Sequence, residues 1–179
     1  WTSLRPLYWD DGTFNVYAIY PRMDKITSLD SQPFSVALDQ NTPKTATSLG
    51  GYEASDLLFA SQKSVTASDS PVALLFHHIM SKLRIRLIKG EDFEGELPTN
   101  AKVYIHSTIT SATVDLCQGI VTYNPRVARQ SIIAHQDDET SYSAIVVPQN
   151  IPTSMPFLEV EVNGVSYFYE SRFNYKPGV

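Results

Sequence analysis

The stretch Pro71–Lys89 has the sequence PVALLFHHIMSKLRIRLIK and decides the fold class of this 179-residue chain. In its second half, apolar residues alternate with cationic ones: the apolar residues are Leu83, Ile85 and Leu87, and the cationic residues are Lys82, Arg84 and Arg86. Successive side chains of a β-strand point to opposite faces, so this alternation predicts a strand with one buried face and one solvated face. A shift of the register by one residue would bury the cations, and this fixes which face meets the core.

In the first half of the same stretch, apolar residues again occur at every second position, but on the other face of the strand. Val72, Leu74 and Phe76 are apolar at every second position, yet the positions of Phe76 and Leu83 differ by an odd number. The apolar face therefore changes side within His77–Lys82. A β-bulge or a brief break of the strand there is the simplest explanation.

Further runs of aromatic and β-branched residues lie between Gly, Pro, Asn and Asp positions and predict more strands. They are Phe14–Tyr20, Phe34–Leu38, Ala101–His106, Thr113–Leu116, Ile120–Tyr123, Ser131–Ala134 and Ser141–Val147. The periodicity of the short apolar run Asp56–Ala60 does not distinguish a helix from a strand, and a strand is favoured. The rest of Met23–Ser55 is rich in small polar residues and is predicted to be loop. No capped amphipathic pattern longer than about two helical turns occurs in the sequence.

The last part of the chain carries the clearest local signal. Leu158–Val162 and Val165–Tyr169 alternate on either side of Asn163-Gly164, the pair that a tight hairpin turn with two positive φ angles requires. This turn predicts pairs between Val162 and Val165, Val160 and Tyr167, and Leu158 and Tyr169 on one dry face. The other, largely wet face would then carry Glu159, Glu161, Ser166 and Phe168.

These patterns together predict an all-β chain with little helix. About eight to ten short strands separated by turns favour an antiparallel β-sandwich with Greek-key connections. A chain of 179 residues is long enough to bury a sizeable core, so we expect residues 1–179 to form one sandwich domain.

Charge and cysteine content restrict the function. The net charge is −5, and the densest basic group is the alternating Lys82, Arg84 and Arg86, which argues against a nucleic-acid partner. Cys117 is the only cysteine, so the chain forms no internal disulfide and no zinc site with several thiolates. We expect Cys117 to be buried as a small apolar residue. No apolar run of about 18 residues predicts a membrane-spanning helix.

The residues that could carry chemistry favour structural roles. His77 and His78 would point to opposite faces of a strand and not chelate one metal, with one at the rim of the core and the other on the surface. His106 and His135 have no Glu or Cys at a ligand spacing. Asp137-Asp138-Glu139 lacks the alternation and the glycine of a calcium loop, so a solvated acidic loop is expected.

No nucleophile elbow, phosphate loop, dinucleotide fingerprint or zinc-protease motif occurs in the sequence. The sequence therefore predicts no catalytic residue, no cofactor-binding residue, no metal ligand and no cofactor, and it favours a protein that is not an enzyme. The ten Tyr and two Trp exceed what a core of this size needs. We expect most of them to pack in the core or on the sheets, and some are candidates for a patch that stacks on sugars or docks a protein.

Several segments, taken in order, carry a resemblance to a known family. They are Tyr8-Trp9 ahead of Val16–Pro21, Asp56–Ala60, Val72–Leu87 with Phe76-His77 and Ser81-Lys82-Leu83, Ala144–Val147 followed by Pro148-Gln149, and Val162-Asn163-Gly164 with Tyr167. In this order and spacing they resemble the fimbrillin-like (Mfa-like) proteins of the Bacteroidales, over most of the chain.

The resemblance implies a transthyretin-like sandwich outside the cell, exported as a lipoprotein to the outer membrane and used in fimbriae, pili or other adhesive structures. Subunits of this family join by donating a strand to a neighbour, which requires an open sheet edge. Related chains continue past a Pro-Gly such as Pro177-Gly178, so we expect this chain to be the N-terminal domain of a longer protein. Its lipid anchor would lie outside the chain.

The predicted function is a structural cell-adhesion subunit of a surface fimbria or pilus that assembles with other fimbrial subunits by strand addition. Host or bacterial surface proteins or glycans are further candidate partners. The main alternative is a surface glycan-binding module that uses aromatic platforms. A hydrolase built on a sandwich is the third alternative, since two carboxylates at any sequence spacing would serve a glycosidase.

Overall fold

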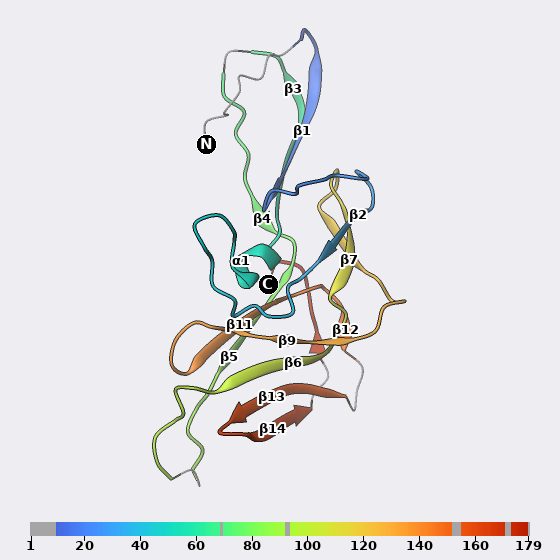
Figure 1. Cartoon of the computed structure of the whole chain (residues 1–179). Helices are drawn as coiled ribbons and strands as arrows, with labels where there is room; N and C mark the ends of the chain where they lie inside the picture. Colours follow the sequence, from blue (N-terminus) through green and yellow to red (C-terminus); the bar gives the residue numbers. More distant parts are fainter. Residues whose placement is uncertain (1–9, 69, 92–93, 152–154, 171–172, 179) are drawn as a thin grey trace.

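The computed structural model describes residues 10–68, 70–91, 94–151, 155–170 and 173–178. Strands make up 46% of the described residues and helix 3%, and the sheets are antiparallel (Figure 1), so the predicted all-β sandwich class is confirmed. No helix of the described residues is long and apolar enough to cross a membrane.

The described residues form five small sheets. The first contains β1 (Thr13–Tyr20), β3 (Leu58–Thr66) and β4 (His77–His78). The second contains β10 (His135–Gln136), β11 (Ser141–Val146) and β5 (Ser81–Arg86). The third has the order β14 (Val165–Glu170), β13 (Pro156–Val162), β6 (Lys102–Thr108) and β9 (Gln130–Ile133). The fourth contains β2 (Gln32–Ser35), β7 (Ser111–Asp115) and β8 (Ile120–Tyr123), and the fifth pairs β12 (Asn150–Ile151) with β15 (Phe173–Asn174).

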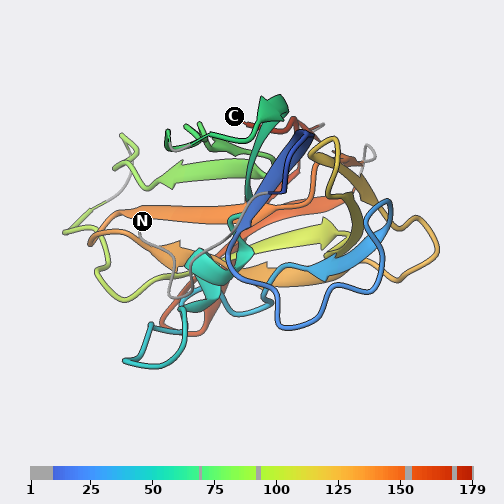
Figure 2. The same cartoon turned by 90° about the horizontal axis from the view of Figure 1, so that it is seen from above.

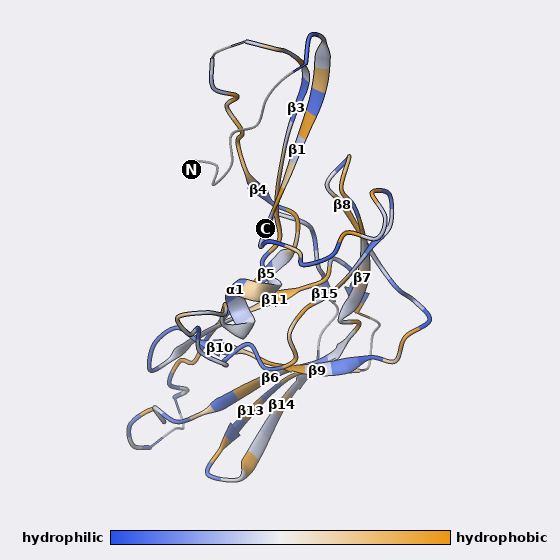
Figure 3. Ribbon diagram, turned by 45° about the horizontal axis from the view of Figure 1, so that its top comes forward, coloured by the Kyte–Doolittle hydropathy of each residue, from blue (hydrophilic) through white to orange (hydrophobic). Residues whose placement is uncertain are grey.

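The core lies between the second and the third sheet. Ile105 and Ile132 of the third sheet and Val146 of the second are fully buried in one apolar cluster. The apolar stretch of β11, orange in Figure 3, runs through the middle of the molecule and is buried on both of its faces. The one-turn helix α1 (Gly51–Ser55) packs beside β11.

The strand predicted around Leu83 is confirmed as β5. Leu83 is buried and Ile85 half-buried, whereas Lys82, Arg84 and Arg86 are exposed. The predicted break is also present, because β4 ends at His78 and β5 begins at Ser81, with Ile79 and Met80 buried between them.

The predicted hairpin forms with the predicted register. Val162 pairs with Val165, Val160 with Tyr167 and Leu158 with Tyr169. Asn163 and Gly164 have φ angles of 51° and 79°, as the tight turn requires. The prediction of a dry face on β14 is wrong, because Val165, Tyr167 and Tyr169 are exposed. Only β13, which lies one strand further in, packs its side chains partly against the core.

Three local predictions are corrected. Residues 72–76 form no strand, because no described strand pairs with them. The strand expected over Phe34–Leu38 is Gln32–Ser35, because the Ala37 N–H leaves the sheet and donates to the Ser55 hydroxyl at 2.9 Å. Gly51–Ser55 is helix rather than loop, since a single turn is too short to show a helical period. The described residues form 15 strands, four of them only two residues long, which is more than the predicted eight to ten.

A two-stranded arm projects from the sandwich in Figure 1. It consists of β1 and β3, paired from Tyr20 with Leu58 at its base to Thr13 with Thr66 near its end. The small strand β4 pairs only with Leu58 and Phe59 at that base. The segment Tyr8-Trp9, which contributed to the family resemblance, lies outside the described residues.

Candidate interaction site at the edge strand β14

The strand β14 ends the four-stranded sheet and is exposed along its whole length (Figure 1). Among the described residues, β13 is its only partner strand, and none pairs with its outer side. Four of its apolar and aromatic side chains are 53–61% exposed: Val165, Tyr167, Phe168 and Tyr169. The strand also contains no Lys, Arg or Pro, the residues that usually protect an edge from pairing.

The hairpin register decides which backbone groups of β14 face outward. A two-residue turn closes on a hydrogen-bonded pair, here Val162 with Val165, and such pairs alternate with non-bonded pairs along an antiparallel ladder. The N–H and C=O groups of Val165, Tyr167 and Tyr169 therefore point toward β13. Those of Ser166, Phe168 and Glu170 point away from the sheet.

The opposite edge of the same sheet is covered. The Ile133 N–H of β9 donates to the Leu38 carbonyl at 2.7 Å, and the Gln40 N–H donates to the Ile133 carbonyl at 3.0 Å. Asp39 forms a parallel bridge with Ile133 between these two bonds. The sheet is thus closed at β9 and open at β14.

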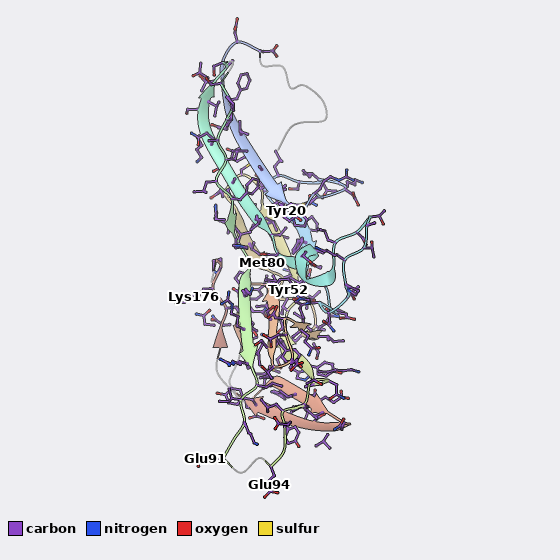
Figure 4. The ribbon with its side chains drawn as sticks, turned by 90° about the vertical axis from the view of Figure 1, so that its left-hand side faces the viewer. Tyr20, Tyr52, Met80, Glu91, Glu94 and Lys176 are labelled. Carbon is purple, nitrogen blue, oxygen red and sulfur yellow. The ribbon has the colours of Figure 1, made fainter. Side chains whose placement is uncertain are left out.

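Other free edges carry protective features. Along β5, the Gly178 N–H donates to the Met80 carbonyl at 2.8 Å, and the Ser81 hydroxyl donates to the Lys176 carbonyl. Figure 4 shows Met80 and Lys176 close together at this place. The remainder of the β5 edge presents alternating cations. The strand β8 has only four residues, and β1 contains a register shift between Phe14 and Val16.

One row of side chains crosses the outer face of the sheet. Glu159 of β13 pairs with Phe168 of β14 on one side and with Tyr104 of β6 on the other, so the three side chains share a face. His106, two residues after Tyr104, is on that face as well. Its ring stacks on Tyr104 with centroids 6.1 Å apart, and it lies 6.2 Å from the ring of Phe168.

Hydrogen bonds on both nitrogens fix the His106 ring. Its Nδ1 is 2.6 Å from the Ser131 hydroxyl, and its Nε2 is 2.7 Å from Glu159 Oε2. The Ser166 hydroxyl donates to Glu159 Oε1 at 2.5 Å. The hydrogen bond from Ser166, together with the one from His106, lowers the pKa of Glu159 below its ordinary value despite partial burial. The residues therefore form a prearranged polar and aromatic cluster.

An open depression of about 290 Å³ lies beside this cluster. Its wall includes His106, Arg129, Gln130, Ser131 and Phe168. The Arg129 Nη1 donates to the Ser107 carbonyl at 2.6 Å, which fixes the guanidinium at the depression. Ser107 itself has a φ of 57°, where β6 bulges out of its ladder with β9.

The two adjacent histidines differ from the prediction. Both His77 and His78 are exposed, so neither lies at the rim of the core, because β4 is an edge strand at the base of the arm. His78 Nδ1 is 2.8 Å from Asp56 Oδ1, and the His77 ring meets Phe59 edge-on. His135 stacks on Tyr52 with centroids 5.1 Å apart.

The acidic loop and the cysteine have mainly local roles. Asp137-Asp138-Glu139 is exposed, as predicted, and Asp138 Oδ1 accepts the N–H groups of Thr140 and Ser141, which lowers its pKa. Cys117 is half-buried rather than buried, because it lies in the turn between β7 and β8.

One group of side chains has metal-ligand chemistry. Asp30, Asp115 and Cys117 each place one ligand atom within 4.8 Å of the other two. Asp115 Oδ1 already accepts the N–H groups of Cys117 and Gln118, so its carboxylate is used to hold the turn.

The sequence predicted that some aromatic residues are candidates for an exposed patch. In the structure, several exposed aromatic side chains, Phe168 among them, lie together on β14. Trp1 and Trp9 lie outside the described residues. Sequence reasoning missed the contact between His106 and Glu159. The hairpin signal placed Glu159 on the wet face, but only the pairing of β13 with β6 brings His106 next to it.

Fold and site together define an antiparallel β-sandwich with one open, aromatic edge strand. The chain belongs to the fimbrillin-like family, whose model matches residues 1–178.

Solved structures share this fold. A protein of Bacteroides ovatus with a proposed role in cell adhesion superposes with a TM-score of 0.69 at 23% identity, over 96% of this chain and 61% of that one. A Bacteroides uniformis protein with the same proposed role gives 0.69 at 21% identity, over 92% of this chain and 64% of that one. A third, from Bacteroides thetaiotaomicron, gives 0.61 at 20% identity, over 95% and 64%. This chain thus spans less than two thirds of the length of these proteins. Among curated protein sequences, no match is found.

Proposed function

We propose that this chain is a structural subunit of an adhesive fimbria or pilus and that it assembles by adding a neighbour's strand to the open edge of β14. The observation that carries the proposal is the unprotected edge itself, six residues long and exposed throughout. An incoming strand would pair with the outward N–H and C=O groups of Ser166, Phe168 and Glu170. It would also cover Val165, Tyr167 and Tyr169, whose apolar surface is now in water.

The contrast between the two edges of the sheet supports this assignment. The β9 edge of the same sheet is closed by Leu38–Gln40, and β5, an edge strand of another sheet, is charged, so neither offers an equally free ladder. The relatives with a proposed adhesion role share the fold, which fits a subunit of the same kind.

The wider setting belongs to the same proposal. The subunit acts in an extracellular fimbria at the outer membrane, and it reaches the surface as a lipoprotein. The chain forms one transthyretin-like sandwich domain. Its partners are other fimbrial subunits.

Self-association of the chain tests the proposal. Replacing Ser166 with Pro removes an outward N–H, which an edge strand tolerates, and leaves the bonds to β13 in place. Sedimentation of the purified chain over a range of concentrations should show oligomers of the wild type and a monomer for Ser166→Pro.

The matched control is Ser166→Ala, which loses the same hydroxyl but keeps the backbone donor and should assemble like the wild type. A wild type that stays monomeric at every concentration, or a Ser166→Pro variant that assembles normally, would refute strand addition at β14.

A further inference from the structure

The depression beside Phe168 has features that strand addition does not use. Pairing at the edge occupies backbone groups of β14, whereas the depression opens on the outer face of the sheet. Phe168 contributes an exposed ring to that face, close to the fixed ring of His106. A flat exposed ring is the surface on which the apolar face of a sugar stacks.

Polar side chains share the wall of the depression with the Phe168 ring. Arg129, which directly precedes β9, and Gln130 and Ser131, the first two residues of that strand, all line the depression. Such a mixture of one aromatic surface and a few fixed polar groups is typical of small-ligand sites. A volume of about 290 Å³ is enough for about one sugar ring.

The charge of the wall selects the kind of sugar. Arg129 is half-buried, and its Nη1 is held by the Ser107 carbonyl. Arg129 forms no ion pair with any carboxylate in the part of the chain that the structure describes. The depression is lined by no Asp or Glu among these residues. The nearby carboxylate of Glu159 is already engaged by His106 and Ser166.

A fixed guanidinium without an anionic partner is a good receptor for a carboxylate, because it offers several N–H donors in one plane. We propose that this depression binds a pyranose sugar that bears a carboxylate, with the sugar ring on Phe168 and the carboxylate on Arg129. Ser131 and Gln130 then hydrogen-bond to hydroxyl groups of the same ring.

Two sources supply this chemistry, uronic acids of polysaccharides and sialic acids at the ends of glycan chains. Calorimetry or a glycan array with the full chain distinguishes them, using a short oligogalacturonate and sialyllactose as acidic probes and lactose as the neutral one. Binding of either acidic probe with at least about tenfold preference over lactose is expected, and the stronger of the two identifies the source.

Paired variants assign the contacts. Phe168→Ala should weaken binding of the acidic probe about tenfold or more, whereas Tyr169→Ala, which removes an equally exposed ring from the opposite face, should leave it unchanged. Arg129→Gln should abolish the preference for acidic over neutral sugar, and Arg129→Lys should keep part of it because the charge remains. Thermal unfolding of each variant confirms that the sandwich is intact.

The proposal is overturned if the wild type binds neither acidic probe, if lactose binds equally well, or if Phe168→Ala and Tyr169→Ala have the same effect. These outcomes are independent of assembly. Ser166→Pro should still bind the acidic probe, and Phe168→Ala keeps the backbone N–H that strand addition needs.

Discussion

Gln40 pairs with the backbone of Ile145 through both ends of its side-chain amide. Its Nε2 donates to the Ile145 carbonyl at 2.6 Å, and the Ile145 N–H donates to its Oε1 at 2.8 Å. The antiparallel register of β10 and β11 pairs His135 with Ser143, so Ile133 would be the next bonded partner of Ile145. Ile133 instead belongs to β9 in the other sheet, and the Gln40 amide takes its place.

A second buried glutamine makes the same pair of hydrogen bonds with the backbone between β6 and β7. The Gln149 Nε2 donates to the Ile109 carbonyl at 2.7 Å, and the Ile109 N–H donates to Gln149 Oε1 at 2.8 Å. In both cases a strand leaves its sheet, and an amide satisfies backbone groups that would otherwise be buried without partners.

Replacing Gln40 with Ala should lower the free energy of unfolding by about 2 to 4 kcal/mol, because the N–H and C=O of Ile145 would both lose their partner in the interior. Urea unfolding measures the change. Gln62→Ala, at an exposed position of β3, is the control and should stay within about 0.5 kcal/mol of the wild type. Equal effects of the two substitutions would contradict the role given to Gln40.

Replacing Gly119 with Ala should destabilise the chain by about 2 to 4 kcal/mol. Gly119 has a φ of 69°, and a Cβ there would lie 2.4 Å from Cδ1 of Phe59, a buried ring that cannot move freely. Gly164→Ala is the matched control, because Gly164 has a φ of 79° but nothing within 4 Å of an added Cβ. It should cost only about 1 kcal/mol, and thermal or urea unfolding that gives similar losses for both would show that Phe59 is not the obstacle.

The Glu159 cluster should respond to acid. Because hydrogen bonds lower the pKa of Glu159, its contribution to stability is complete above the ordinary value of 4.5 and is lost as the pH falls through the lowered folded-state value. Ser166→Ala removes the strongest of these hydrogen bonds, so it should move the pKa of Glu159 upward. A carbon-13 NMR titration of the carboxyl group measures this, and an unchanged midpoint in the variant would contradict the assignment.

Tyr142 should make the sandwich sensitive to alkali. Its hydroxyl donates to the Ala101 carbonyl at 2.9 Å in the core, and burial, aided by the charge of Asp138, raises its pKa. The stabilisation is present below the ordinary tyrosine pKa of 10.0 and is lost as the pH rises through the raised folded-state value.

Tyr142→Phe should therefore cost about 1 kcal/mol at neutral pH and flatten the loss of stability above pH 10. Unfolding by urea at neutral and alkaline pH compares the two chains. A parallel decline of both with rising pH would mean that other tyrosines cause it.

Several elements could be predicted because their signal lies within a few neighbouring residues. The alternation around Leu83 gave β5 with the correct faces, and Asn163-Gly164 gave the hairpin with its register. The helix at Gly51–Ser55 was missed, because one turn has no measurable period. The exposure of Tyr167 and Tyr169 was missed as well. A local pattern shows which face of a strand is apolar, but it does not show whether another layer of the protein covers that face.

The sequence by itself determined that this chain is built of antiparallel strands, because the period of two is a property of adjacent residues and fixes which side of a strand is apolar. The tertiary structure alone decided which strand is the open edge, which histidine contacts Glu159, and which glutamine side chain bonds the backbone where a strand has left its sheet. Each of these depends on residues from distant parts of the chain, such as Gln40 and Ile145. Pairing over such distances is selected by the packing of the whole core, and residues adjacent in sequence do not encode it.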